Sequence, residues 1–333
     1  MHQNPGAAAR RAGGPTRFTF LRALAFAGAA TAIGTSAHAS CGTAFCAVNT
    51  DWASDALGLS EGAVLDVRFE YIDQDQPRTG SRRIAVGQIP HHHDEVRTVN
   101  RNLLVNYSRS FASGWGYAVA LPLVDRDHFH IHNHRGGQIP ERWEFRRIGD
   151  LRLTGRYQQA LGAQASSTAG VLFGLKLPTG RTSVANDAGD VAERSLQPGS
   201  GTTDAILGAF FHQQVSDAGS WFAQAQLQHP LNKRDDFAPG AQLSLDLGYA
   251  RRVADRLSGL LQLNAVVKRR DRGAQAEPDD SGSRSLFLSP GLSWDATDRV
   301  RVYAFYQHPL RQHVNGVQLT ARRALAVGVA TRF

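Results

Sequence analysis

Four histidines occupy every second position of the stretch DHFHIHNH, and the spacing between them is their most informative property. A period of two belongs to a β-strand, in which alternate side chains line one face of the sheet. Phe129 and Ile131 stand between the histidines, so the strand has one polar and one apolar face. Imidazoles two residues apart are about 6.7 Å apart along the backbone, close enough for both to reach one ion. The pattern indicates a row of potential metal ligands on one face: His128, His130, His132 and His134.

A second group of ligand-type residues precedes this strand in the chain. It consists of His91, His92, His93, Asp94 and Glu95. If the strands that carry the two groups are neighbours, both groups meet at one opening. Nitrogen ligands with carboxylates nearby suit zinc, copper or nickel rather than calcium. Because neutral imidazole is the form that binds metal, we expect binding to weaken below about pH 6.5.

Three interpretations of the histidine row stay open at this point. It is a hydrated polar rim without a resident metal, a transient transition-metal site at the mouth, or a pH-sensitive gate, since clustered histidines gain charge together in mild acid. No cofactor is certain from the sequence, and the second interpretation calls for a Zn, Cu or Ni ion. Two other histidines, His229 and His308, share the phase of Trp221 and Tyr306 and are expected at a membrane interface.

The segments that must hold these residues alternate between apolar and polar side chains throughout the chain. In AQLSLDLGYA, residues 241–250, Leu243, Leu245 and Leu247 point one way, whereas Ser244 and Asp246 point the other. About a dozen stretches of roughly ten to sixteen residues show this pattern, and the polar face is too charged to be buried in a soluble sandwich. The sequence therefore predicts a sheet with one face in lipid and one face in water.

The links between these stretches alternate in length. Short links fall near 112–115, 162–167, 217–220, 254–256 and 296–298, and polar, mostly longer loops fall at 74–97, 134–146, 180–201, 232–240 and 271–284, with a brief turn near Asn315. Short periplasmic turns and long outer loops are typical of outer-membrane barrels, whose closure satisfies every backbone polar group. The predicted fold is an all-β, transmembrane, antiparallel up-and-down β-barrel of about 12 strands over residues 62–333, in contact with outer-membrane lipid. A secreted soluble all-β protein is the alternative.

The N-terminus indicates the compartment. Arginines without acidic residues, then the apolar run ALAFAGAATAIGT and a small-x-small site at Ala37–Ala39, predict a signal peptide over 1–39 with cleavage after Ala39. Residues 40–61 are then expected to form a periplasmic tail. Cys41 and Cys46 are the only cysteines, and in an oxidising compartment a disulfide between them is the default. The expected location is the outer membrane of a Gram-negative bacterium.

The loss of four arginines with the signal peptide lowers the net charge from +8 to about +4. Because the charges are spread out and the chain is exported, no nucleic-acid partner is expected. The last strand ends on Phe333, with Leu325, Val327 and Val329 in the same phase. A terminal aromatic residue on an alternating strand resembles the signal that bacterial outer-membrane barrels present to the barrel-assembly machinery.

Two stretches in the middle of the chain, KLPTG at 176–180 and LQPGSGTTDAILG at 196–208, carry a family resemblance. They resemble a strand–loop–strand unit of outer-membrane transporters linked to the meta-cleavage pathway of phenol degradation. The resemblance implies a barrel with a transport role. It covers chiefly residues 170–210 and does not include the histidine-rich stretches.

The inward phases of the predicted strands carry charges of both signs. These candidate lumen residues are Asp66, Arg68, Glu70, Arg152, Arg156, Lys176, Asp246, Lys268 and Arg270. About twelve strands leave an interior between a filled core and an open channel, which favours a narrow passage for ions or small solutes. The alternative is a salt-bridge network that plugs the barrel.

No catalytic arrangement stands out in the sequence. The chain has no GxSxG motif and no distinct serine–histidine pair, so the protein is not expected to be an enzyme. The leading prediction is an outer-membrane channel with a histidine-rich outer mouth, ahead of a non-conducting structural, metal-sensing or adhesive barrel and of an outer-membrane hydrolase. Four prolines that recur near outer strand ends, where a ladder hydrogen bond is lost, are expected at bulges or strand ends: Pro122, Pro178, Pro230 and Pro309.

Overall fold

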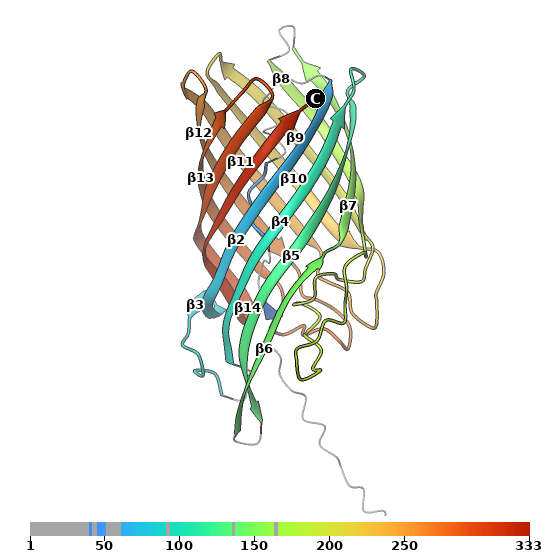
Figure 1. Cartoon of the computed structure of the whole chain (residues 1–333), viewed down its shortest axis with the longest axis vertical. Coiled ribbons are helices and arrows are strands. Elements are labelled where there is room, and N and C mark those ends of the chain that lie inside the picture. The colour runs from blue at the N-terminus through green and yellow to red at the C-terminus, as the bar shows by residue number, and fades with distance from the viewer. Residues whose placement is uncertain (1–39, 42–44, 51–60, 91–93, 135–136, 163–165) are drawn as a thin grey trace, which may run out of the picture. The chain divides into compact units, whose positions relative to one another are not determined.

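A computed structural model describes residues 40–41, 45–50, 61–90, 94–134, 137–162 and 166–333, without the side chains of residues 40, 41 and 134. Within these ranges no helix is long and apolar enough to cross a membrane. Strands form nearly all of the regular structure (Figure 1). They are β1 (Ser40–Cys41), β2 (Gly62–Gly80), β3 (Arg82–Arg83), β4 (Asp94–Ser110), β5 (Trp115–His134), β6 (Gly137–Ile148), β7 (Leu151–Leu161), β8 (Ser167–Leu177), β9 (Asp204–Ser216), β10 (Gly219–Pro230), β11 (Gln242–Ala254), β12 (Leu257–Lys268), β13 (Ser283–Asp295) and β14 (Val300–Arg332).

The wall of the barrel is one antiparallel sheet that closes on itself. Its order runs from β14 through β13, β12, β11, β10, β9, β8, β7, β5 and β4 to β2, and β2 pairs back with β14. The long β14 turns at Asn315 and Gly316, where Gly316 has a φ of 54°. Its first part pairs with β13 and its second part with β2, so it supplies two segments of the wall. The eleven labelled wall strands, with β14 folded back, confirm the predicted barrel of about 12 strands.

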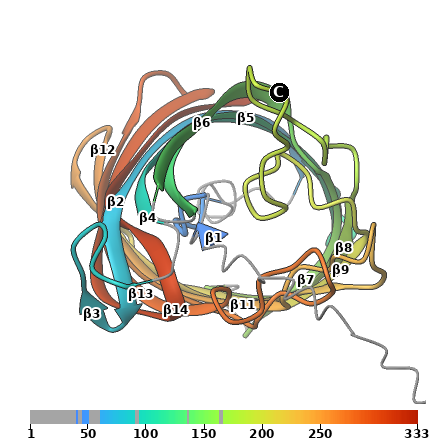
Figure 2. The same cartoon turned by 90° about the horizontal axis from the view of Figure 1, so that it is seen from below.

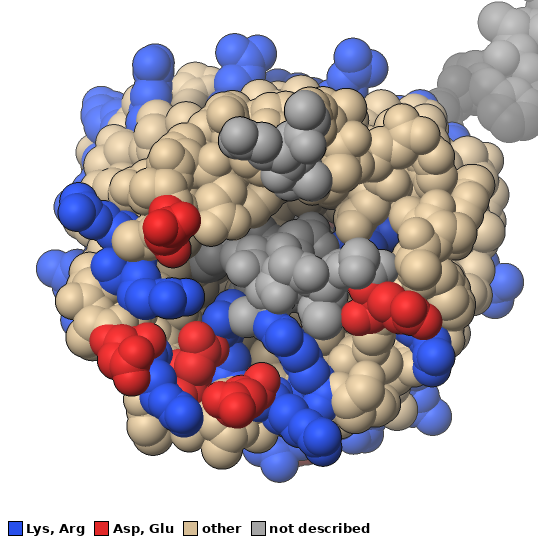
Figure 3. Space-filling model, turned by 90° about the horizontal axis from the view of Figure 1, so that it is seen from above, with Lys and Arg blue, Asp and Glu red and all other residues tan. Residues whose placement is uncertain are grey.

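Both ends of the wall meet at one end of the barrel. The N–H of Ala63 donates to the carbonyl of Phe333 at 3.0 Å, and the N–H of Phe333 donates back at 3.1 Å. The short links lie at this end, which we call the periplasmic end, and the longer connections with β3 and β6 lie at the opposite, outer end (Figure 1). Charged side chains of both signs gather on the periplasmic face, with Lys and Arg around its edge (Figure 3).

Exposed apolar side chains form rows across the outer surface because paired residues share a face. One row joins Val329, Val67, Val105 and Leu121 through β14, β2, β4 and β5. On β4 and β5 the continuous apolar rows reach Leu103 and Leu123, and beyond them ion pairs occupy part of the outer face. Asp125 pairs with Arg101 at 3.4 Å and with Arg146 at 2.6 Å, and Asp127 pairs with Arg142 at 2.7 Å. The outer halves of β4 and β5 therefore rise above the lipid.

The segment 134–146, predicted as a loop, is largely β6. Its outward residues include Arg142, Glu144 and Arg146, so the strand lacks the apolar alternation expected of a membrane strand. Up to Ala120, β5 pairs with β7, and from Leu123 onward it pairs with β6. Pro122 stands at this change of partner, where its carbonyl accepts a hydrogen bond from Gly149. Pro230 ends β10, Pro178 follows β8, and Pro309 adjoins a register shift between β13 and β14, as predicted.

The two stretches that carry the family resemblance meet in a buried ion cluster at the outer end of β7, β8 and β9. The Lys176 ammonium lies 2.8 Å from the Asp150 carboxylate and 3.3 Å from that of Asp204, and it donates to the Thr202 carbonyl at 2.9 Å. Asp150 also accepts the backbone N–H groups of Gly180 and Ser200. The cluster thus fixes both ends of the loop between β8 and β9 against the start of β7.

We expect the substitution Lys176→Met to destabilise the folded barrel by about 3–5 kcal/mol, because it leaves two buried carboxylates without their cation. Urea unfolding of the barrel in lipid vesicles measures the change. The matched control is Lys233→Met, which removes an exposed ion pair with Asp236 and should cost at most about 1 kcal/mol. Equal effects of the two substitutions would contradict a structural role of the cluster.

Candidate functional site

The outer half of β5 presents its histidines to the interior, as the alternation predicted. Arg126, His128 and His130 are buried, whereas Phe129 and Ile131 occupy the other face. His132 is partly exposed. The side chain of His134 and residues His91, His92 and His93 lie outside the described residues.

Two of these histidines and one carboxylate converge. His128 Nε2 lies 3.2 Å from His130 Nδ1 and 3.9 Å from Glu95 Oε2. One ligand atom from each of the three residues lies within 4.8 Å of the others. The exposed fractions are 2% for Glu95, 0% for His128 and 2% for His130. Of the predicted ligands, the described residues bring together these three.

The remaining nitrogen of each imidazole has its own partner. His128 Nδ1 lies 2.8 Å from the Thr98 hydroxyl, and His130 Nε2 lies 2.8 Å from Glu141 Oε2. The Trp143 ring packs against both imidazoles, with centroid distances of 5.9 Å and 5.0 Å. These contacts orient the two rings so that His128 Nε2 and His130 Nδ1 face the same space.

Burial dominates the electrostatics of this cluster, which lies above the lipid-facing rows. Burial raises the pKa of the Glu95 carboxyl well above its usual range, and the charges of Glu193, Glu277 and Asp280 raise it further. Burial also lowers the pKa of His128, with added contributions from His130 and Arg126. Neither carboxylate oxygen of Glu95 has a hydrogen-bond partner among the described residues.

The other described ligand candidates have different roles. Asp94 accepts a hydrogen bond from the Asn133 amide at 3.0 Å, and His132 Nδ1 lies 3.7 Å from Glu141 Oε2. His308 is exposed and stacks on Tyr306, and His229 is exposed on β10. Both face outward, as expected.

Residues 45–50, which we call the inner segment, run inside the barrel rather than in a periplasmic tail. The N–H of Cys46 donates to Glu70 at 3.2 Å, and the N–H of Asn49 donates to the Gln262 side chain at 3.1 Å. The Asn49 amide reaches Asp246 at 3.2 Å. Just before this segment, β1 pairs in parallel with Gln318 and Leu319 of β14, and it lies within the ring of strands in Figure 2. The lumen side chains supply hydrogen bonds that a free tail would take from water.

Cys46 is a free thiol in the structure, which differs from the predicted disulfide with Cys41. The backbone of Cys41 lies opposite Leu319, whereas the Cys46 thiol contacts the carbonyl of Leu325. The two cysteines thus lie beside different positions of β14, and the Cys46 thiol takes part in no disulfide.

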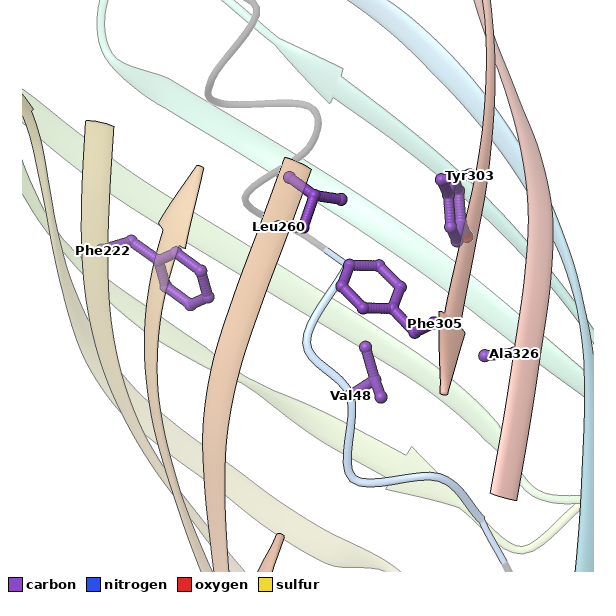
Figure 4. Packing of buried hydrophobic residues seen from close by; sticks show 6 residues of the cluster. All are labelled: Val48, Phe222, Leu260, Tyr303, Phe305 and Ala326. Carbon is purple, nitrogen blue, oxygen red and sulfur yellow. The ribbon is translucent and has the colours of Figure 1, made fainter. Parts of the chain in front are cut away.

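An apolar cluster anchors the inner segment in the lumen. The Val48 side chain packs among inward-pointing side chains from β10, β12 and both segments of β14 (Figure 4): Phe222, Leu260, Tyr303, Phe305 and Ala326. Glycines on adjacent strands make room for the rings. A Cβ atom on Gly248 would lie 2.1 Å from the Phe222 ring, and one on Gly328 would lie 2.3 Å from the Tyr303 ring. The lumen is therefore not uniformly polar.

Most of the predicted lumen residues do point inward and bind one another or the inner segment. Asp66 accepts from the Tyr303 hydroxyl at 2.7 Å, Arg68 donates to Thr50 and pairs with Glu70, and Asp246 accepts from Asn264. Arg152 donates to Gln228 at 3.0 Å. Arg156 donates to Ser110, and Lys176 belongs to the ion cluster. At the outer end Lys268 pairs with Asp271 at 2.9 Å. Arg270 differs, because β12 ends at Lys268 and Arg270 pairs with Asp279 in the exposed loop.

Several residues of these sites were not found from the sequence. Glu141 and Trp143 alternate in PERWEF, so recognition of β6 as a strand would have placed both on the inner face. Inward glycines opposite aromatic residues, such as Gly248 and Phe222, are the signal that marks the apolar cluster. The inner segment itself has no periodic pattern, and its contacts are all distant in sequence.

Comparisons with known proteins agree with this architecture. The crystal structure of the COG4313 outer membrane channel from Pseudomonas putida F1 has a TM-score of 0.64 and 12% identity, and the match covers 83% of this chain and 96% of that one. The NanC porin gives a TM-score of 0.46 with 11% identity over 81% of this chain and all of that one. The CymD monoaromatic hydrocarbon channel gives 0.43 with 9% identity over 90% and 98%. No curated protein sequence matches the chain.

The structural match to the COG4313 protein shows that the chain has the fold of an outer-membrane β-barrel. A family model described as "Putative MetA-pathway of phenol degradation" matches residues 104–326, which is most of the barrel and includes both resembling stretches. The chain belongs to this family of outer-membrane β-barrels.

Proposed function

We propose that the protein is a passive outer-membrane channel for small solutes or ions, with a histidine-rich outer mouth that binds a transition-metal ion. The observation that carries the first part is a closed barrel whose interior holds charged and amide side chains throughout its length. Asp66, Asp246 and Arg152 line it at different strands. Such polar groups can form hydrogen bonds and ion pairs with polar solutes that pass through the lumen.

We infer that the described arrangement is a closed state of this proposed channel. Glu70, Asn102 and Asn264 have no exposed surface, and the inner segment hydrogen-bonds across the lumen between β2 and β12. In the described part of the chain, these contacts come from the six residues of the inner segment. Departure of the inner segment is therefore the simplest route to an open lumen.

The histidine-rich mouth is supported by the inward direction of His128 and His130 and by the nearby Glu95. These groups lie above the lipid, where an ion arriving from outside meets them before the inner segment. Transition metals are the class of ion that imidazole nitrogens prefer.

We expect the double variant Val48→Ser/Asn49→Ala to raise single-channel conductance in planar bilayers severalfold over the unsubstituted protein. The valine leaves the apolar cluster and the amide no longer binds Asp246, so the inner segment loses its anchors. The matched control is Phe45→Ala, which changes an exposed side chain of the same segment.

Two results bear on the channel itself. Equal conductance of the double variant and the control would show that the inner segment does not close the lumen. Silence of every form, with folding verified by heat-modifiable migration in gels, would support the non-conducting structural barrel instead.

A further inference from the structure

We propose that Glu95, His128 and His130 form a buried three-ligand site for a divalent transition-metal ion inside the outer mouth. This inference deepens the proposed function, on whose histidine-rich mouth it rests, by assigning the ligand atoms and the class of ion. The site lies within two paired strands, because Glu95 of β4 is the register partner of His130 of β5.

The distances between ligand atoms fit one small ion. A tetrahedral zinc ion with ligands at 2.0–2.1 Å holds them about 3.3 Å apart. Here His128 Nε2 lies 3.2 Å from His130 Nδ1 and 3.9 Å from Glu95 Oε2. The Glu95 oxygen lies within 4.8 Å of the other two ligand atoms, so a movement of its side chain toward the imidazoles completes the geometry.

The outer contacts of the imidazoles match those of metal-bound histidines. A histidine that binds a metal through one nitrogen usually donates its other N–H to a carboxylate or another oxygen. Glu141 accepts from His130 Nε2, which leaves Nδ1 with a lone pair that faces His128. The Thr98 hydroxyl can accept from His128 Nδ1 in the same way. In these tautomers the lone pairs of His128 Nε2 and His130 Nδ1 face each other across 3.2 Å, and a cation between them would replace a repulsive contact with two bonds.

The surrounding charge favours a cation as well. Glu95 is buried with both carboxylate oxygens lacking a hydrogen-bond partner in the described part of the chain, which is costly for such a group. The negative charges of Glu193, Glu277 and Asp280 disfavour a negative charge on Glu95. The positive charge of Arg126 disfavours a positive charge on His128. A bound dication would use the oxygens of Glu95 and offset the repulsion among these acidic groups.

The donor set determines the class of metal. Two nitrogens and one carboxylate suit Zn²⁺, Cu²⁺ or Ni²⁺, whereas Ca²⁺ and Mg²⁺ need six or more oxygen ligands or water-rich shells. Three protein ligands leave one coordination position for water or for a solute with a donor atom. The site can therefore exchange ligands at its open position, which a closed four-ligand structural site cannot.

The experiment measures Zn²⁺ binding by isothermal titration calorimetry on the full protein, purified from membranes in detergent, stripped with a chelator and carrying no polyhistidine tag. We expect about one Zn²⁺ per barrel. Glu95→Gln and His130→Ala should each weaken binding at least tenfold, and Glu141→Gln should weaken it about 10–100-fold through the orientation of His130. His229→Ala and His308→Ala are matched controls that remove exposed histidines and should bind as the unsubstituted protein does.

Two further measurements and one further variant complete the experiment. The visible spectrum of Co²⁺ at the site reports nitrogen and oxygen coordination, and heat-modifiable migration shows that each variant is folded. Absence of Zn²⁺ binding in the unsubstituted protein, or equal binding by folded Glu95→Gln and His130→Ala, would overturn the inference. So would loss of binding only in a His91→Ala/His92→Ala/His93→Ala variant. Conductance of the same samples is a separate readout, so a barrel that conducts without binding metal refutes this site alone.

Discussion

Closure of the sheet through β14 and β2 is the constraint on which the rest of the structure depends. A barrel in lipid has no water to satisfy an open edge, so the first and last strands must find each other. The Ala63–Phe333 hydrogen bonds bring the two ends of the wall together at the periplasmic end. Once the wall is closed, every strand has an outer and an inner face, and each side chain faces lipid, the lumen or the water above the membrane. The inward position of the histidine cluster follows from this arrangement.

The barrel and the side of it that each residue faces were predictable because lipid imposes a strict period of two. His128 and His130 were placed inward on that basis, and Leu243, Leu245 and Leu247 outward. The alternation of apolar and polar residues holds only for the part of a strand that contacts lipid. Above Leu123 the outward residues of β5 and β6 include Asp125, Asp127, Arg142 and Arg146, which form ion pairs, so β6 had no apolar alternation and was predicted as a loop. A strand with water on both faces has no apolar alternation, so it can be recognised only from the strand with which it pairs.

The composition of the proposed metal site depends on strand register, which could not be predicted from the sequence. The expectation that β4 and β5 are neighbours was correct, but the pairing of Glu95 with His130 follows a shift of register between Glu95 and Arg97. A shift of one residue turns a side chain to the opposite face. Without that irregularity Glu95 and Arg97 would share a face, whereas Arg97 instead pairs with Asp73 and stays half-exposed. The carboxylate of the site is thus supplied by a local departure from the alternation that predicts everything else.

The inner segment is held differently from the wall. Burial of Val48 and the hydrogen bonds of Cys46, Asn49 and Thr50 stabilise the segment in the lumen, and they oppose the conformational entropy lost when its backbone is ordered. The wall strands are instead joined to one another in a closed hydrogen-bonded sheet. In the proposed channel, a free-energy difference of a few kcal/mol between the two positions of the segment keeps a minor open state populated. On this proposal the wall holds the pore in the membrane, and the inner segment determines whether the pore is open.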